Sequence, residues 1–483
     1  MNIDNSKFVH LHCHGEYSHF DGLARISDVD IKTEDNNLVL VARKMGFPAM
    51  AITDHGNIGG WIKFIAACTA TKDKNGDPIP YAPIKPILGM ESYLSRNRHW
   101  KSKDSAEENG GYQKDGRKGN RHLNLYAMNW DGYQNLCTLS QTAWTEGLYF
   151  KDPRIDLELL AKNSKGIMGS SACLGSIINA NLLYDRYEEA KTAAGLLKEI
   201  LDGNFFLEIQ YHGMPEEKHI AKDILKLSRE LDLPVCATQD SHYIYKHQAK
   251  AQEVLMCMST SNCLTNPKHI RLPYDEFYFK SAAEMEQIFH HIPQVLTNTY
   301  TISERIDSAE IQRNLFGGMR LPKFELPQGF DTPMKYLVHL AKEGLKKLGW
   351  DKSQKHIDAL KMELRDIQVA KDMNGYDFAT YFLIVWDYVN FARSKGIITG
   401  AGRGSGYASV LLRCLGVYYG PDPLLYGLIW ERFLGFDSKK FVMDMDFGFI
   451  TKSKSVEIPI EIVSSGDDED RDVVADPGGV DRY

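Results

Sequence analysis

The first half of the chain contains seven short apolar runs, and each run ends in a residue type that binds divalent metals. Runs of this length, separated by polar and helical stretches, predict buried strands. The polar residues at their ends are His12 and His14, Asp54 and His55, Glu91, His122, Cys173, His212, and Asp240 and His242. Since barrels of alternating strands and helices carry their chemistry at the C-terminal ends of the strands, the pattern predicts one shared metal site there.

Helical patterns lie between these runs. Strands that alternate with helices at this interval predict a parallel sheet or barrel. The expected helices of the first half are residues 38–45, 62–70, 187–201 and 216–231. Residues 96–121 interrupt the pattern, because they are rich in Lys, Arg, Gly and Asn. They predict a solvated loop or, alternatively, a phosphate-facing loop near the site.

The sequence pattern changes after about residue 286. Apolar residues three and four positions apart predict two amphipathic helices, which a more buried helix follows. These helices are expected at 334–348, 357–373 and 381–392. A short strand at 397–399 then precedes a glycine-rich loop and a helix at 407–415. Residues 448–483 are Ser-rich and then acidic, which predicts a disordered or foreign tail.

The composition fits a soluble globular protein of two or three domains. The chain has 483 residues, of which 43% are hydrophobic and 25% are charged. No apolar run reaches the roughly 18 residues that span a bilayer, and the N-terminus lacks the apolar core of a signal peptide. Eight cysteines without CxxC pairs indicate reduced thiols, so we expect a cytoplasmic protein without a membrane partner. The net charge of −7 does not decide whether nucleic acid binds, because a phosphate-binding face can be local.

Spacing within the runs favours metal binding over scattered core histidines. Side chains on a strand alternate between its faces, so His12 and His14 share one face, and Asp240 and His242 repeat that arrangement. Imidazole nitrogen suits zinc, manganese or iron, and added carboxylates let a site hold two or three ions. A single such histidine is more often an ordinary hydrogen-bonded residue, but the recurrence at successive strand ends argues against that interpretation. Clustered divalent ions promote phosphoryl chemistry.

Two further patterns lie in the second half of the chain. The loop GAGRGSGYAS, residues 400–409, lies between a strand and a helix, where glycines and helix N–H groups let a phosphate approach. Its spacing matches neither a dinucleotide fingerprint nor a Walker loop, and such loops are more often plain turns. Asp444 and Asp446 are two positions apart on an expected strand, so both side chains face one side, about 6.5 Å apart along the backbone. That geometry suits two magnesium ions, although an ordinary strand with one wet face also fits.

The motifs FVHLHCHGEYSHFDG, AITDHGN, PILGMESY, SSACLG and ATQDSHY resemble the PHP (polymerase and histidinol phosphatase) domain of the bacterial DNA polymerase III alpha subunit family. The resemblance implies an α/β fold, with a PHP-type distorted (β/α)7 barrel over residues 7–285 and a partial α+β polymerase palm over 286–447. It also implies a cluster of zinc, manganese or iron. The implied ligands of this cluster are His12, His14, Asp21, His55, Glu91, His122, Cys173, Asp240 and His242.

The same resemblance separates ligands from other polar residues of the runs. Asp54 would orient neighbouring ligands, whereas His10 and His212 match no ligand position. The intact ligand set implies a metal-dependent 3′→5′ exonuclease in the barrel.

The second half resembles the palm of this family through YFLIVWDYVNFARSKGI, GRGS, DPLLYGLIWERFL and DMDF. The resemblance implies that Asp444 and Asp446 are two of three catalytic aspartates and bind Mg2+. It also implies a nucleotide-binding loop, formed by Gly402, Arg403, Gly404 and Ser405. The implied activity is DNA-directed DNA polymerisation, in which a primer 3′-hydroxyl on primer–template DNA attacks a dNTP.

The sequence departs from this family in several places. Ala401 stands where the family has proline, and Phe441 and Val442 replace a Pro-Asp pair. The third catalytic aspartate and the fingers of the family lie beyond the part that this chain resembles. We therefore expect a split gene, with a C-terminal polymerase fragment supplied in trans, or a frameshift or intron that makes the tail foreign. The alternatives are a freestanding PHP phosphoesterase or nuclease and a non-catalytic structural PHP scaffold.

Overall fold

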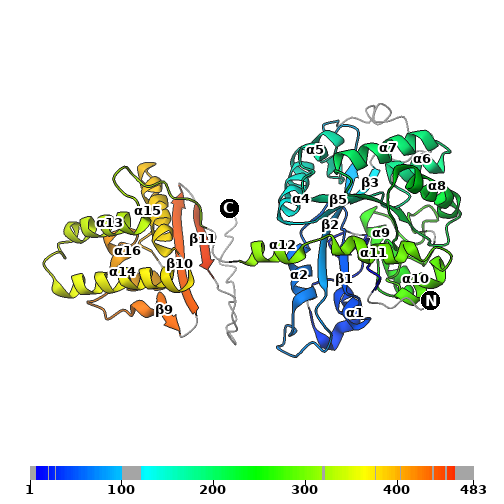
Figure 1. Cartoon of the computed structure of the whole chain (residues 1–483). Coiled ribbons are helices and arrows are strands. Elements are labelled where there is room, and N and C mark those ends of the chain that lie inside the picture. The colour runs from blue at the N-terminus through cyan, green and yellow to red at the C-terminus, as the bar shows by residue number, and fades with distance from the viewer. Residues whose placement is uncertain are drawn as a thin grey trace. The chain divides into compact units, whose positions relative to one another are not determined.

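The computed structural model divides the chain into two compact units, Met1–Phe316 and Gly317–Tyr483 (Figure 1). It describes residues 7–19, 21–27, 29–100, 121–272, 274–317, 321–375, 377–402, 404–437, 440–451 and 454–462. In these ranges no helix is both long and apolar enough to cross a membrane. The first unit extends past residue 285, the expected end of the barrel domain, because helix α11 (Gln294–Glu304) packs on the sheet. The Val9 amide donates a hydrogen bond of 2.9 Å to the Thr299 hydroxyl of this helix.

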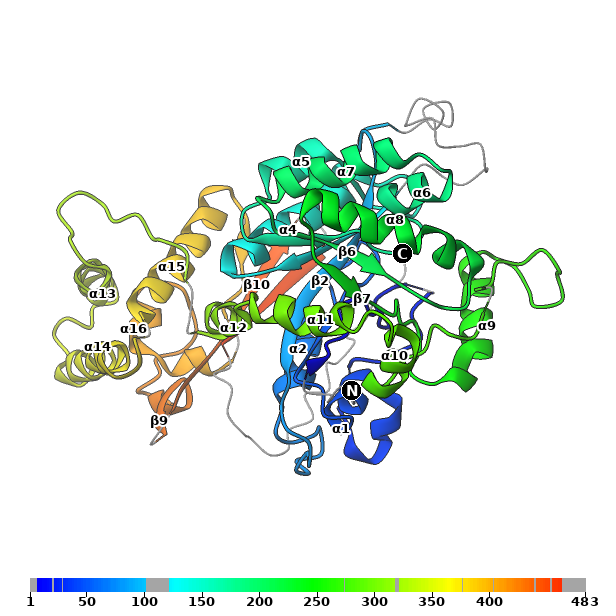
Figure 2. The same ribbon diagram turned by 45° about the vertical axis from the view of Figure 1, so that its right-hand side comes forward.

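A curled sheet of seven strands forms the centre of the first unit (Figure 2). Its main path runs through β1 (Ala49–Ile52), β2 (Lys85–Leu94), β3 (Arg121–Ala127), β5 (Ile167–Ser170), β6 (Phe205–Ile209) and β7 (Val235–Ala237), and β4 (Arg154–Ile155) pairs with β2. Bridges from His10 to Met50 and from Cys13 to Ser241 place the first apolar run between β1 and the turn after β7. The predicted distorted α/β barrel is confirmed.

One strand runs against the predicted parallel arrangement. β1 and β2, β5 and β6, and β6 and β7 pair in parallel, but β3 is antiparallel to both β2 and β5. A parallel pair needs a crossover connection, usually a helix, whereas antiparallel neighbours do not. The stretch between β2 and β3 lacks helical periodicity in the sequence, which explains the reversal.

Helices surround the outside of this sheet (Figure 1). They are α1 (Leu38–Lys44), α2 (Trp61–Thr69), α4 (Trp130–Thr142), α5 (Leu157–Lys162), α6 (Ile177–Leu183), α7 (Tyr187–Ile200), α8 (Pro215–Leu231), α9 (Ala249–Ser259), α10 (Ala282–Phe289), α11, and α12 (Ser308–Phe316). In α8, Pro215 occupies the first turn, where its missing N–H costs nothing. Ile220, Ile224 and Leu227 then bury one face of α8 at helical spacing.

The second unit combines helices with a four-stranded antiparallel sheet. Its elements are α13 (Pro333–Lys347), α14 (Gln354–Asn374), α15 (Phe378–Ser394), β8 (Ile398–Thr399), α16 (Val410–Cys414), β9 (Leu434–Asp437), β10 (Lys440–Thr451) and β11 (Lys454–Ile462). Phe382, Leu411 and Phe433 are fully buried in its apolar core.

Strands β10 and β11 continue into the segment that the sequence assigned to a tail. The tail was expected from residue 448, whereas the antiparallel pair of β10 and β11 reaches Ile462. Apolar residues alternate along β11, at Val456, Ile458 and Ile460, which is the pattern of a strand. The rest of the expected tail, 463–483, lies outside the described residues.

Candidate metal centre

The structure brings all nine predicted ligand residues together at one site in the first unit. They come from the first apolar run and the loop after it, and from β1, β2, β3, β5 and β7 or the turns that follow these strands. Most fall into three overlapping groups whose candidate ligand atoms lie within 4.8 Å of one another. The groups are His14, His55 and His242; His12, His14 and Asp240; and His55, Glu91 and His122.

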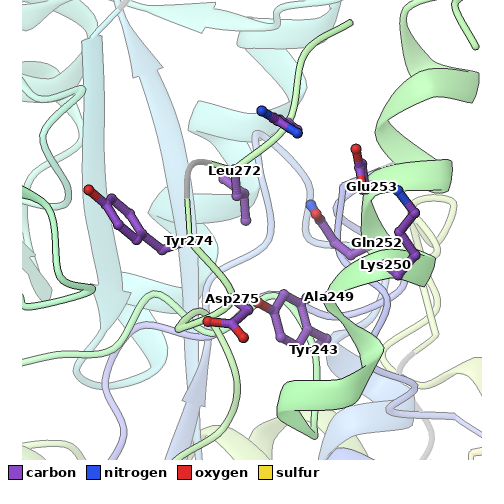
Figure 3. Close-up of a pocket in the computed structure, with 9 residues that line it drawn as sticks. Tyr243, Ala249, Lys250, Gln252, Glu253, Leu272, Tyr274 and Asp275 are labelled. Atoms are coloured by element: carbon purple, nitrogen blue, oxygen red, sulfur yellow. Dashed lines mark hydrogen bonds and ion pairs between the residues drawn. The ribbon is translucent and has the colours of Figure 1, made fainter. Parts of the chain in front are cut away.

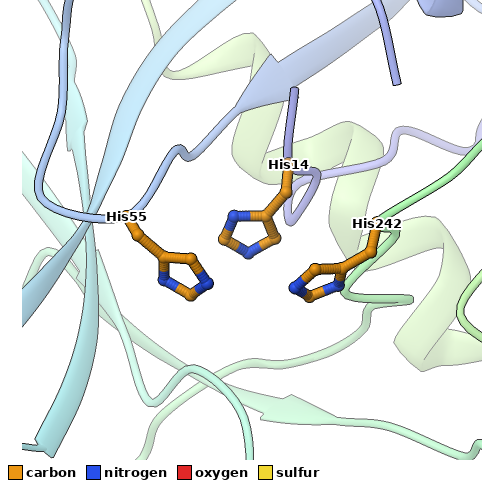
Figure 4. A group of neighbouring side chains, drawn as sticks. All are labelled: His14, His55 and His242. Carbon is orange, nitrogen blue, oxygen red and sulfur yellow. The ribbon is translucent and has the colours of Figure 1, made fainter. Parts of the chain in front are cut away.

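His14, His55 and His242 form the first group (Figure 4). The ring of His14 stacks between the other two, with centroids 4.2 Å from His55 and 4.4 Å from His242. Asp240 connects this group to the second, since its Oδ1 lies 3.1 Å from the Nε2 atoms of both His12 and His14. The φ angle of Asp240 is 49°, a left-handed conformation that is uncommon outside glycine and concentrates at functional sites.

Glu91 is buried at the centre of the cluster. Its Oε2 lies 2.8 Å from His55 Nδ1 and 3.4 Å from His14 Nε2. Its Oε1 lies 3.0 Å from His122 Nδ1 and 3.4 Å from His12 Nε2. A carboxylate that approaches four imidazoles in this way is suited to bridge more than one ion.

Asp21 and Cys173 complete the cluster at its edges. The Oδ2 of Asp21 lies 3.3 Å from His55 Nε2, and the Sγ of Cys173 lies 3.3 Å from His122 Nδ1. Gln252 of α9 is buried and donates a hydrogen bond of 3.0 Å to the Asp21 carboxylate. Gln252 therefore orients Asp21, a role that no sequence motif indicated.

The inner atoms of the cluster have no hydrogen-bond partner within the described part of the chain. They are His12 Nε2, His14 Nε2, His55 Nδ1, Glu91 Oε2 and Asp240 Oδ1. Buried polar groups are nearly always hydrogen-bonded, and each unpaired one costs about 1–3 kcal/mol. Several of these atoms nevertheless lie within ion-pair distance of one another, as His55 Nδ1 and Glu91 Oε2 do at 2.8 Å. Nitrogen and oxygen atoms that converge in this way suit a cluster of divalent metals.

The carboxylates of the cluster are held in their ionised form. Burial alone would raise the pKa of Asp240, but neighbouring histidines outweigh burial and hold this pKa well below its usual range. The pKa of Glu91 is lowered well below its usual value for the same reason. Burial, and then the adjacent His55 and His242, lower the pKa of His14 to about 3. The site therefore presents ionised carboxylates and a neutral His14, which are the forms that bind metals. His12 differs: burial would lower its pKa, but Asp240, Glu208 and Glu91 outweigh burial and raise this pKa well above its usual value, so a metal would displace a proton from this ring on binding.

Glu208 on β6 is a site residue that the sequence analysis missed. It is buried, and its Oε2 lies 2.8 Å from Nδ1 of His12. Asn124, Ser170 and Thr238 also donate hydrogen bonds to its carboxylate. A carboxylate on the second nitrogen of a ligating histidine fixes the tautomer and orientation of the ring. The one signal in the sequence was a lone carboxylate inside the apolar run FFLEIQ.

Asp54 orients His14 through Ser18. Its Oδ1 accepts hydrogen bonds from the Gly15 amide at 2.7 Å and from the Ser18 hydroxyl at 2.8 Å. The same hydroxyl lies 2.8 Å from Nδ1 of His14. Burial raises the pKa of Asp54 to about 6. Asp54 thus contacts the ligands through a neighbour, as the resemblance implied.

His212 ends an apolar run but does not join the cluster. Its Nδ1 lies 2.5 Å from Glu217 Oε1, and its Nε2 lies 2.6 Å from the Gln239 carbonyl oxygen. The ring of His10 is also held by a backbone carbonyl, since its Nε2 lies 2.7 Å from the Lys280 carbonyl oxygen. The strand-end pattern alone was therefore wrong for His212, because a carboxylate five residues later along the chain binds its ring.

The glycine-rich loop of the second unit packs tightly against aromatic rings. Gly402 has a φ of 105°, and a Cβ there would lie 1.7 Å from the Tyr418 ring. The Tyr407 hydroxyl donates a hydrogen bond of 2.6 Å to the Gly402 carbonyl. Gly404, with a φ of 81°, precedes the short 3-10 helix Ser405–Ala408. Glycine is thus required here by packing, and Arg403 lies outside the described residues.

The two predicted catalytic aspartates lie on the strand next to this loop. Asp444 and Asp446 belong to β10, where their register partners on β11 are Glu461 and Pro459. β10 also pairs with β8, the strand that leads into the glycine-rich loop. The loop therefore follows β8, and the aspartates lie on β10, which is its neighbour in the same sheet.

Two family models match the chain. Residues 10–212 match the PHP domain, and residues 335–461 match the bacterial DNA polymerase III alpha NTPase domain. The DNA polymerase III subunit alpha of Borreliella burgdorferi is 37% identical, over 92% of this chain and 35% of its own length. Those of Helicobacter pylori (strain J99) and Thermus aquaticus are 34% and 31% identical, over 95% and 93% of this chain. The chain spans about a third of the length of these relatives, 35% to 38%.

Proposed function

Because the chain carries a PHP domain and part of a bacterial DNA polymerase III alpha domain, we propose that it forms the N-terminal part of such an alpha subunit. The barrel is a metal-dependent 3′→5′ exonuclease in this proposal, and the complete enzyme is a DNA-directed DNA polymerase. The convergence of buried nitrogen and oxygen atoms around Glu91 is the observation that supports the exonuclease.

Some barrel residues are the proposed metal ligands, and others orient those ligands. The nine clustered residues are the proposed ligands of zinc, manganese or iron, which when bound supply positive charge to the phosphate oxygens and activate water. Glu208 orients His12, and Ser18 with Asp54 orients His14. These contacts keep the imidazole nitrogens directed at the same point before substrate binds.

Digestion of a primer with a mispaired 3′ end tests the exonuclease. We expect the purified full chain with manganese to shorten this primer, and His12→Ala to lose activity by about 100-fold or more, because one ligand of the cluster is removed. His219→Ala is the control, since His219 is exposed on α8 and pairs with Asp185. Absence of digestion by the wild type, or equal digestion by His12→Ala, contradicts the proposal.

For polymerisation, Asp444 and Asp446 are the proposed Mg2+ ligands, and the loop from Gly402 to Ser405 holds the triphosphate. The pairing of β8 with β10 supports these roles, because the loop directly follows β8 and the aspartates lie on β10. Primer–template DNA and dNTPs are the proposed substrates in the cytoplasm. Primer extension by an enzyme that contains this part should be lost in Asp444→Asn and in Asp446→Asn, and extension that survives either change contradicts the proposed Mg2+ ligands.

A further inference from the structure

A cavity of about 540 Å³ opens beside the metal cluster. Asp21, His55 and His122 are among the predicted ligands that line one part of it. The rest of its wall is mainly apolar, with Leu174, Leu183, Met214, Leu272, Tyr274 and Phe277, and it also includes the polar residues Gln210 and Glu216. The volume lies within the roughly 300–1,000 Å³ of small-molecule sites. A ligand that fills this cavity therefore needs a charged group for the cluster and an apolar group for the wall.

Tyr274 is an aromatic ring of this wall that the protein leaves uncovered. It is 42% exposed, and within the described residues it forms no hydrogen bond, ion pair or ring contact. Phe277 differs, because it is buried and stacks on His212 with ring centroids 3.9 Å apart. Tyr274 is thus free to stack on a ligand, whereas Phe277 already has a partner.

The direction of the Tyr274 side chain agrees with this role. Leu272 and Tyr274 also border a second cavity, of about 390 Å³. Figure 3 shows the Tyr274 ring on the opposite side of its segment from Tyr243, Gln252 and Glu253, which line the second cavity. Tyr274 thus borders both cavities, and its ring points away from the other labelled residues of the second one.

We propose that the cavity beside the metal cluster binds the 3′-terminal nucleotide of a DNA strand, with its phosphate at the cluster and its base stacked on Tyr274. The proposal rests on the exonuclease function and adds a residue that selects nucleotides. Base stacking on an aromatic ring tolerates every base, because each base has a π-face. A terminal nucleotide of any sequence is therefore accepted, as removal of mispaired ends requires.

The apolar wall disfavours the small sugar phosphates that a freestanding phosphoesterase would use. A sugar carries hydroxyl groups where a base carries a flat apolar face. Against Leu174, Met214 and Leu272 those hydroxyl groups would lose hydrogen bonds to water without replacement, which costs free energy. The wall thus favours a phosphate that carries a nucleobase.

Calorimetric titration of the manganese-loaded full chain with dAMP and with 2-deoxyribose 5-phosphate tests the proposal. The two ligands share a sugar and a phosphate and differ in the base. We expect dAMP to bind about 10-fold or more tightly in the wild type, the size of one stacking contact. Tyr274→Ala should bind both ligands equally, and Tyr274→Phe should retain the preference because its ring still stacks.

Tyr211→Ala is the matched control, since Tyr211 is 43% exposed and does not line this cavity. It should keep the preference for dAMP. Equal binding of both ligands by the wild type, or a preference that survives in Tyr274→Ala, overturns the proposal. Binding of dAMP needs no turnover, so a wild type that prefers dAMP but digests no primer supports the nucleotide site and refutes the exonuclease. Primer digestion by a wild type that shows no preference for dAMP supports the exonuclease and refutes the nucleotide site.

Discussion

Glu208 and Glu217 are buried carboxylates that each contact the ring of one histidine in the barrel. Glu208 lies 2.8 Å from Nδ1 of His12, which belongs to the cluster of proposed metal ligands. Glu217 lies 2.5 Å from Nδ1 of His212, which does not. The two pairs have similar chemistry and burial, so they separate an effect on the metal site from the general effect of removing a buried charge.

Glu208→Gln should weaken metal binding, because the amide cannot support the ionic hydrogen bond that orients His12. We expect the affinity of the first unit for manganese or zinc to fall by about 10- to 100-fold. Competition with a coloured chelator measures this affinity without any need for catalysis. Glu217→Gln should leave it within about twofold of the wild type. Similar losses in both variants would contradict a specific role for Glu208.

The proposed metal ligands were easier to predict from the sequence than the residues that orient them. The strand-end positions of His12, Asp240 and His242 were visible because apolar runs end in metal-binding residue types. The role of Glu208 could not be predicted from the sequence, because it depends on contact with His12 and on hydrogen-bond donors from β3, β5 and the turn after β7. Gln252 was missed for the same reason.

At the scale of elements, a buried carboxyl group on α14 caps the helix that follows the glycine-rich loop. Both oxygens of Glu363 accept hydrogen bonds of 2.8 Å from the first turn of α16. The donors are the Ser409 hydroxyl and the amides of Val410 and Leu411. These bonds satisfy N–H groups that a helix leaves unpaired at its start. Glu363 therefore fixes the end of the loop for which nucleotide binding is proposed.

The stability of the second unit should depend on pH through Glu363. Burial raises the pKa of its carboxyl from 4.5 to about 8. Between these values the unfolded chain has released the proton and the folded chain retains it, so the stabilising contribution is complete below pH 4.5 and is lost as pH rises towards 8. We expect the unfolding free energy of the second unit to fall by about 1.4 kcal/mol per pH unit in this range.

Urea unfolding curves at pH 5 and pH 7.5 measure this dependence. Glu363→Gln, which has no ionisable group, should lose it, whereas Asp358→Asn on the exposed face of α14 should keep it. A second unit that becomes more stable with rising pH would contradict the prediction.

Elements were predicted well where the periodicity is local. The helix expected at 216–231 is α8, Pro215–Leu231. The helix expected at 407–415 is instead a 3-10 turn and then α16, because the Ser409 side chain caps the Leu412 amide and starts a new helix. The antiparallel direction of β3 was missed, since periodicity carries no information on strand direction.

For the whole molecule, metal binding should stabilise the first unit alone. The ligands lie between residues 12 and 242, so only the folded barrel brings them together. At a free metal concentration 100 times the Kd, the folded first unit gains about 2.7 kcal/mol. We expect calorimetry to show that EDTA lowers the unfolding temperature of the first unit and leaves that of the second unchanged. Equal shifts in both units, or no shift in either, would contradict a metal site confined to the barrel.

The sequence by itself determined the elements, the α/β class and the residue types that bind metals, because apolar periodicity and side-chain chemistry are local properties. Only the tertiary structure decided which of these residues meet. His12 and Glu208 lie 196 positions apart in sequence yet are in hydrogen-bond contact, whereas His212 is bound by Glu217 and is excluded from the cluster. Such contacts depend on how strands distant in the chain pair and pack, and no local pattern encodes that pairing.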